Sequence, residues 1–181
     1  SSALDRQMEI GVNALLFFRN AMRAAVQTPL ASEVLENVQV EFAQQRHQPF
    51  WRISVDQRRT LPITGVSDAF VARHPLLSRD DPQMHNEMTA ALEVGYIMRL
   101  ATAIPAMPKH AWYVSRAGFF LSSQPAAVSA ESVARYESLL AQPWFTGQSN
   151  HANRFRGVRW FTSEQHAGQQ ESLVTVSVPL D

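Results

Sequence analysis

The chain contains no cysteine. This excludes disulfide bonds, thiolate zinc sites and cysteine nucleophiles. It also lacks any apolar run of about 18 residues, so no segment is predicted to span a bilayer. Its 16 lysines and arginines balance its 16 aspartates and glutamates. General nucleic-acid binding is not expected, because that binding needs an excess of cations to displace counterions from phosphate.

The usual signatures of catalysis are missing as well. Seven glycines are scattered singly, and the six histidines include no pair at metal-ligand spacing on a shared helix face. Asp80 and Asp81 fall in a predicted loop, a poor setting for a general acid. Residues 65–68 lack the second glycine and the following helix signal of a nucleophile elbow. We therefore predict no catalytic residue, no metal and no cofactor.

What the sequence does contain is a strong helical pattern at its start, over residues 3–27. Apolar residues recur at alternating steps of four and three, the spacing of a coiled-coil seam: Leu4, Met8, Gly11, Leu15, Phe18, Met22 and Ala25. Leu16 and Phe17 widen this face beyond a seam. The helix therefore either packs on its own domain or pairs in a dimer, and both are compatible along one helix. Because no signal-peptide pattern precedes it, we expect a fragment whose targeting segment lies upstream.

The next part of the chain predicts helices over residues 32–45 and 82–103, and a short strand over residues 51–55. Prolines and a glycine interrupt residues 56–82, which are predicted to be irregular. One face of the later helix is expected to carry Met84, Met88, Leu92, Tyr96 and Leu100, with Ala91, Gly95 and Met98 flanking it.

The second half changes to a strand period. Residues 112–122 predict a hairpin, residues 129–141 a helix, and residues 158–162 and 173–178 two further strands. Because helices come first and antiparallel strands later, we expect an α+β domain with helices packed on one sheet.

Aromatic residues beside cations mark the candidate binding region. Trp144 and Phe145 follow a predicted helix, and residues 159–161 put Arg, Trp and Phe on a predicted strand. A helix end and central strands can face one concave pocket, where Tyr113 or Arg116 would fix a polar group. The alternative is that these aromatic residues belong to the core. Adjacent residues of a strand point to opposite faces, so Trp160 and Phe161 cannot both face the pocket.

Several phrases, in order along the chain, carry a family resemblance. The sequence resembles the periplasmic region of enterobacterial diguanylate cyclases of the YedQ (DgcQ) type, a CHASE-type and double-Cache-like sensor. The phrases are Arg58–Pro62, Gly65–Ala69, Leu76–Arg79, Ala90–Tyr96, Tyr113–Phe119, Gln142–Phe145, Arg159–Ser163 and Thr175–Pro179. The layout is also similar to the membrane-distal part of a double Cache sensor, with helices packed on an antiparallel PAS/Cache-like sheet.

This resemblance implies a periplasmic sensor domain in an inner-membrane protein whose cytoplasmic cyclase makes cyclic di-GMP. The chain lacks the Gly-Gly-Glu-Glu-Phe signature of the cyclase, so we expect it to be non-catalytic. Residues 1–28 would form a signalling helix that mediates a homodimer, and residues 29–181 the sensor domain, truncated before its last strand. A small-molecule ligand, with amino acids as one class, would control the dimer. The alternative is a protein-interaction module that docks a periplasmic binding protein.

The resemblance also implies a ligand site with departures. Amino-acid-sensing Cache domains hold the ligand carboxylate with the arginine of an Arg-x-Trp-Tyr motif; here Gln142 and Phe145 replace the arginine and the tyrosine. The family's preceding tyrosine falls on Glu137, and its Tyr-x-Asp falls near Phe161 and Ser163. The usual carboxylate clamp is therefore absent. The predicted ligand-binding residues are Tyr113, Arg116, Gln142, Trp144, Phe145, Arg159, Trp160, Phe161 and Ser163.

Overall fold

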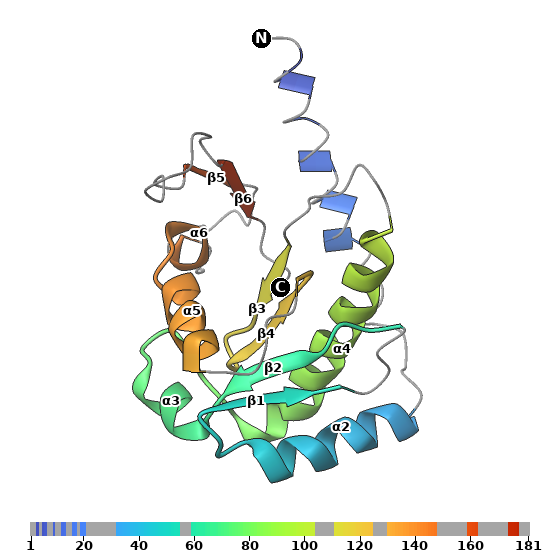
Figure 1. Cartoon of the computed structure of the whole chain (residues 1–181), viewed down its shortest axis with the longest axis vertical. Helices are drawn as coiled ribbons and strands as arrows, with labels where there is room; N and C mark the ends of the chain where they lie inside the picture. The colour runs from blue at the N-terminus through green and yellow to red at the C-terminus, as the bar shows by residue number, and fades with distance from the viewer. Residues whose placement is uncertain are drawn as a thin grey trace.

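Helices and antiparallel strands combine in an α+β fold, as predicted (Figure 1). The computed structural model of the chain describes scattered positions between residues 3 and 20 and the ranges 32–54, 59–103, 111–124, 130–147, 159–162 and 174–177. No helix within these residues is long and apolar enough to cross a membrane.

The described positions between residues 3 and 20 are helical, which agrees with the predicted N-terminal helix. Phe17 leaves 62% of its surface exposed there. The predicted seam, however, lies outside the described residues at every one of its positions: Leu4, Met8, Gly11, Leu15, Phe18, Met22 and Ala25. Its pairing therefore stays a prediction.

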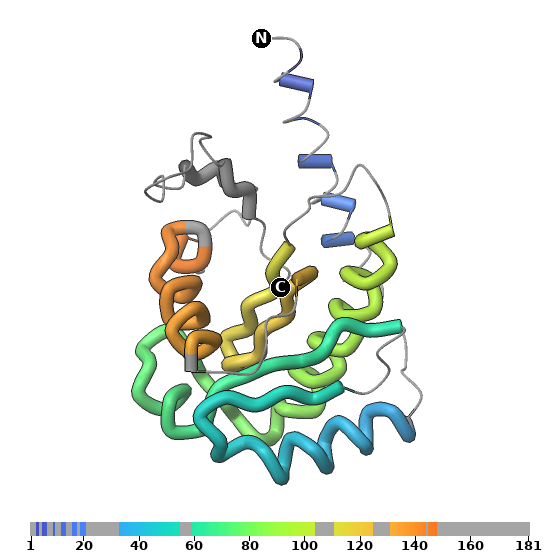
Figure 2. The backbone as a smooth tube through the Cα atoms, in the orientation of Figure 1, coloured from blue at the N-terminus to red at the C-terminus, as the bar shows by residue number. Residues whose placement is uncertain are grey.

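The centre of the fold is a four-stranded antiparallel sheet in the order β1–β2–β4–β3 (Figure 2). Its strands are β1 Phe50–Ile53, β2 Ile63–Val66, β3 Trp112–Val114 and β4 Phe119–Ser122. The predicted hairpin is confirmed as β3 and β4. Its turn contains Gly118 at φ 83°, a left-handed conformation that glycine adopts without the penalty of a Cβ atom.

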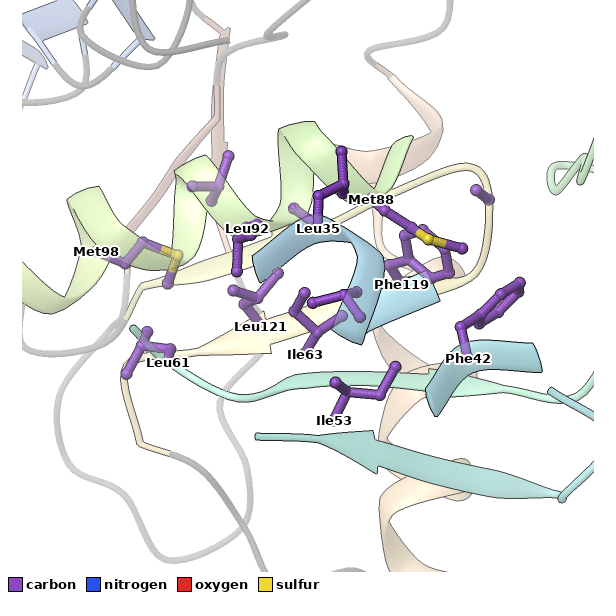
Figure 3. Packing of buried hydrophobic residues seen from close by; sticks show 14 of the residues in the cluster. Leu35, Phe42, Ile53, Leu61, Ile63, Met88, Leu92, Met98, Phe119 and Leu121 are labelled. Atoms are coloured by element: carbon purple, nitrogen blue, oxygen red, sulfur yellow. The ribbon is translucent and has the colours of Figure 1, made fainter. Parts of the chain in front are cut away.

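Two helices, α2 Ser32–Gln45 and α4 Met84–Ala101, cover the first face of this sheet. Leu35 and Phe42 of α2 and several side chains of α4 meet the strands in one apolar core (Figure 3). The rings of Phe42, Trp51 and Phe119 pack edge to face, with centroids 5.4–5.6 Å apart. Because apolar burial stabilises by about 25 cal/mol per Å², this aromatic cluster is a main source of stability.

The buried face of α4 differs in part from the predicted one. Met84, Met88 and Leu92 are buried, but Leu100 is 71% exposed. Four residues turn a helix by about 400°, roughly 40° past a full circle, so a strict four-residue stripe drifts away from the sheet. The residues predicted to flank this face, Ala91, Gly95 and Met98, are all buried, so the buried face turns toward them.

Three helices lie on the second face: α3 Asp68–Arg73, α5 Ala130–Leu140 and α6 Pro143–Thr146. In Figure 1 the α5–α6 segment stands on the opposite side of the sheet from α4. Tyr136 of α5 is 1% exposed, with its ring centroid 6.0 Å from that of Phe70 and 5.9 Å from that of Phe120. Helices therefore cover both faces of the sheet, and the strand β2 is buried along its whole length.

The prediction that residues 56–82 are irregular is wrong for β2 and α3. All four residues of β2 are buried, so its sequence shows no alternation to signal a strand. The signal for α3 was present in Ser67, whose Oγ accepts a hydrogen bond from the Phe70 amide at 3.1 Å. A helix therefore does follow residues 65–67, and the Ser67 hydroxyl caps it.

The last two strands are confirmed but lie in a sheet of their own. β5 Arg159–Thr162 and β6 Val174–Ser177 pair antiparallel in a separate two-stranded sheet, where the sequence predicted one sheet for all strands. The helix α6 contacts both of them. Strand propensity indicates a strand but not its neighbour, because pairing depends on contacts that are remote in sequence.

Candidate ligand-binding site

Tyr113 lies on the first face of the sheet, the face covered by α4. It pairs with Leu121 and packs against the first core. Burial raises the pKa of Tyr113 above its ordinary value, and the charge of Glu87 on α4 adds to this effect. Glu87 also accepts a hydrogen bond of 3.0 Å from the Ser115 hydroxyl. Tyr113 is thus on the side of the sheet opposite to α5 and α6.

Arg116, Gln142 and Phe145 come together at one end of the second face. The guanidinium of Arg116 lies 5.4 Å from the ring centroid of Phe145, within cation–π range. It also donates a 3.4 Å hydrogen bond to the carbonyl oxygen of Leu76. The carbonyl oxygen of Gln142 accepts from the Phe145 amide at 3.0 Å at the start of α6. Phe145 is 7% exposed and belongs to the second core, so its ring already has protein neighbours.

The other predicted residues are less fully described. Trp144 belongs to α6, and Arg159, Trp160 and Phe161 belong to β5, of which the structure describes the backbone. Ser163 lies outside the described residues. A role for these residues in ligand binding stays a prediction.

A small groove opens between the second face of the sheet and α5. Its floor comes from β1, β2 and β4, and its wall from α5. The enclosed space is about 20 Å³, roughly enough for one water molecule. The lining residues are Phe50, Pro62, Thr64, Phe120, Ser122, Gln124, Ser132 and Arg135. None was predicted from the sequence, because they come from segments that only the folded sheet brings together.

The lining of the groove combines aromatic rings, hydroxyl groups and one positively charged side chain. The Thr64 hydroxyl donates a 2.6 Å hydrogen bond to the carbonyl oxygen of Phe120. The Ser122 hydroxyl donates to the carbonyl oxygen of Gln124 at 3.0 Å. Arg135 is exposed and is the charged residue of the lining, which includes no carboxylate. The lining therefore offers apolar surface, neutral hydrogen-bonding groups and one cation within a small space.

A separate ionic cluster lies at the edge of the first core. Arg79, whose side chain is 4% exposed, donates to Asp68 at 2.5 Å, to the carbonyl oxygen of Ala117 at 3.0 Å and to that of Val66 at 3.1 Å. Burial lowers the pKa of this guanidinium, and the neighbouring Asp68 opposes that shift. Arg79 thus connects β2, α3 and the β3–β4 turn.

Arg46, at the end of α2, completes this cluster. It donates to Asp68 at 2.8 Å and to Asp81 at 2.9 Å. Burial on its own would raise the pKa of Asp68, but hydrogen bonds from Arg46 and Arg79 outweigh it and hold the pKa below its ordinary value. These contacts are all within the protein, so we assign the cluster a structural role. Nowhere in the described part of the chain do three or more His, Asp or Glu side chains gather as metal ligands would.

Comparison with known proteins supports a sensory role. No solved structure matches the chain. The model of the CHASE7 family, described as a periplasmic sensor domain, matches residues 1–164. With an α+β fold, a groove over its sheet and a family match along most of its length, the chain belongs to the CHASE7 family of periplasmic sensor domains, which makes it an extracytoplasmic signal-input domain.

Proposed function

We propose that the chain is the signal-input domain of a membrane-bound diguanylate cyclase of the YedQ (DgcQ) type, and that it binds a small molecule in the periplasm. The family match supports the sensor role, and the ordered phrases of the sequence support the cyclase. The observation that carries the ligand-binding part is the groove between β2, β4 and α5. The chain itself is a non-catalytic sensor, and synthesis of cyclic di-GMP belongs to the cytoplasmic part of the parent protein.

Binding in the groove would act through α5. This helix forms one wall of the groove and leads through Gln142 into α6, where Phe145 lies under the Arg116 guanidinium of the β3–β4 turn. A ligand changes the balance of two conformations only as far as it binds them differently. A ligand that contacts both the sheet and α5 favours the arrangement in which these two elements lie at the bound distance. The proposed output is a changed geometry of the helical dimer.

Filling the groove is expected to abolish stabilisation by the ligand. In a thermal-shift screen of periplasmic metabolites, a ligand at 100 times its Kd stabilises by about 2.7 kcal/mol, which raises the Tm by roughly 5–11 °C. Ser132→Trp places a large ring in the groove wall, and this shift should disappear. The control is Ala134→Trp, on an exposed position of the same helix that does not line the groove, and it should keep the shift.

The same two variants, introduced into the parent cyclase, connect binding to output. Cellular cyclic di-GMP should respond to the ligand in the Ala134→Trp protein and stay constant in the Ser132→Trp protein. A library with no stabiliser, or a ligand that stabilises Ser132→Trp as much as the natural sequence, would contradict the proposed site.

A homodimer through the N-terminal helix is the second part of the proposal. Phe17 is favoured for this contact because 62% of its surface is exposed on a helical segment. Phe17→Asp is therefore expected to weaken dimerisation at least about tenfold, since losing an aromatic side chain from the centre of an interface costs about 1.4 kcal/mol or more. Light scattering over a concentration series measures this, with Val40→Asp, also exposed, as the control. A chain that is monomeric at all concentrations would contradict the dimer. Docking of a periplasmic binding protein stays a prediction from the sequence.

A further inference from the structure

We infer that the groove accepts a small organic monoanion, a carboxylate without an ammonium group, and that Arg135 binds its negative charge. This inference rests on the proposed function, in which the groove is the ligand site. It goes further by assigning the charge of the ligand and the residue that selects it.

The charge of the lining points to an anion. Arg135 lines the groove, and within the described part of the chain its guanidinium makes no hydrogen bond or ion pair. Glu131, one helical turn earlier, is exposed and does not line the groove. A guanidinium offers a planar set of donors that matches a carboxylate in a bidentate pair. We therefore assign the negative charge of the ligand to Arg135.

The same lining disfavours a free amino acid. An amino acid carries an ammonium group, which needs a carboxylate or a ring of acceptors when it leaves water. The groove contains no carboxylate, and an ammonium group placed there would lie close to the positive Arg135. The Thr64 hydroxyl hydrogen is already donated to the Phe120 carbonyl, so this group offers only a neutral oxygen. A carboxylate without an amine meets no such cost.

The apolar part of the lining defines the rest of the ligand. Phe50 and Phe120 are half-buried, and Pro62 lies beside them. Their surfaces suit a short alkyl body. The enclosed space of about 20 Å³ is roughly that of one water-sized molecule, so only the end of a short alkyl chain would enter it, with the charged end at the exposed Arg135. Propionate has this combination of one carboxylate and a short alkyl chain.

Three probes of nearly equal size separate the possibilities. We would titrate the whole chain with propionate, propionamide and alanine, following amide shifts of Thr64 and Phe120 by NMR. Propionate should saturate these shifts and bind at least about tenfold more tightly than propionamide or alanine, in keeping with the strength of a charge-assisted hydrogen bond. Arg135→Gln should weaken propionate binding at least tenfold, and Arg135→Lys should restore part of it. Arg99→Gln, which removes an exposed charge from α4, should change nothing.

Several results would overturn the inference. Alanine binding as tightly as propionate would show that an ammonium group is tolerated, and unchanged propionate binding in Arg135→Gln would remove the assigned residue. A metabolite that binds in the groove without a negative charge overturns the anion inference but leaves the sensor function intact. If no molecule of any charge stabilises the chain and Ser132→Trp leaves cyclic di-GMP output unchanged, the proposed ligand site itself is wrong.

Discussion

Replacing Arg79 with methionine is expected to lower the free energy of unfolding by about 3–5 kcal/mol, because it breaks a buried ion pair from one side. Asp68 and the Val66 carbonyl each keep one other donor, from Arg46 and Trp51. The variant loses hydrogen bonds to Asp68 and to the carbonyl oxygens of Val66 and Ala117. It also loses the guanidinium beside the rings of Phe42 and Phe119. Urea unfolding measures this change, and the Tm should fall by roughly 6–20 °C.

The matched control for this prediction is Arg46→Met. Arg46 shares Asp68 with Arg79, but its side chain is 24% exposed and its other partner, Asp81, is 73% exposed. Exposed ion pairs contribute about 0–1 kcal/mol, so the control should lose much less stability than Arg79→Met. Equal losses in the two variants, or a loss below about 1 kcal/mol in Arg79→Met, would show that burial of Arg79 is not decisive.

The pH dependence of the free energy of unfolding is a second test of the Arg79→Met prediction. The pKa of Asp68 is lower in the folded chain than in the unfolded chain. Its carboxylate therefore contributes stability above an unfolded pKa of about 4, and this contribution is lost as the pH falls through the folded pKa. The stability difference between the natural sequence and Arg79→Met should narrow below about pH 4. A difference that stays constant down to pH 2 would exclude Asp68 as the main partner.

The second large effect is expected at Gly65, directly opposite Trp51 in the β1–β2 pair. A Cβ atom at position 65 would lie 2.1 Å from Cζ2 of Trp51, far inside the contact distance. The ring cannot yield easily, because Trp51 is 1% exposed and its Nε1 donates to the carbonyl oxygen of Val66 at 2.9 Å. We expect Gly65→Ala to destabilise the chain by about 3 kcal/mol or more, the upper range for overpacking.

Gly95→Ala is the control for Gly65→Ala. A Cβ atom at position 95 would lie 3.1 Å from Cδ2 of Leu121 and 3.3 Å from the carbonyl oxygen of Leu61, tight contacts that require shifts of a few tenths of an ångström, far less than at position 65. Alanine is also the better helix former, by about 1 kcal/mol, so the net change in urea unfolding should be small. The double variant Trp51→Leu with Gly65→Ala should lose less than the sum of its single variants, because the new methyl group then has space. Strict additivity would contradict a clash with Trp51.

The elements predicted well from sequence are those with a strong local signal. The helix over residues 32–45 agrees with α2, and the apolar period of residues 82–103 agrees with α4. The hairpin follows from a strand period on both sides of a turn that contains Gly118. In the two helices, neighbouring residues carry the whole pattern, because one face meets the core and the other meets solvent. In the hairpin, the turn at Gly118 supplies the local signal.

The missed elements are those whose environment is decided by distant segments. The strand β2 has helices on both sides, so its buried residues do not alternate, and Gly65 suggests a break although it provides room for Trp51. The ionic cluster joins Arg46, Asp68 and Arg79, which are remote from one another in the sequence. No local pattern predicts a contact of this kind.

The residues of the candidate site were likewise predicted only in part. The sequence indicated the region of the hairpin, α5 and α6, and the structure brings Arg116 and Phe145 together there. The sequence did not indicate that Tyr113 lies on the opposite face of the sheet. It also did not indicate that Thr64, Phe120 and Arg135 line one groove. Which face of a strand is covered by which helix depends on how the chain crosses the sheet.

By itself, the sequence determined the class of this protein: an α+β sensor domain without cysteine, catalytic motif or membrane span. Composition and short-range periodicity indicated the α+β class and the missing motifs, because they act through each residue's immediate neighbours. The sensor role came from the resemblance of the ordered phrases to a known family. The tertiary structure alone decided the strand order, the separate β5–β6 sheet, the Arg79 cluster and the groove beside Arg135. These features depend on burial and on contacts between remote segments, whose free energy exists only once the sheet and its helices have assembled.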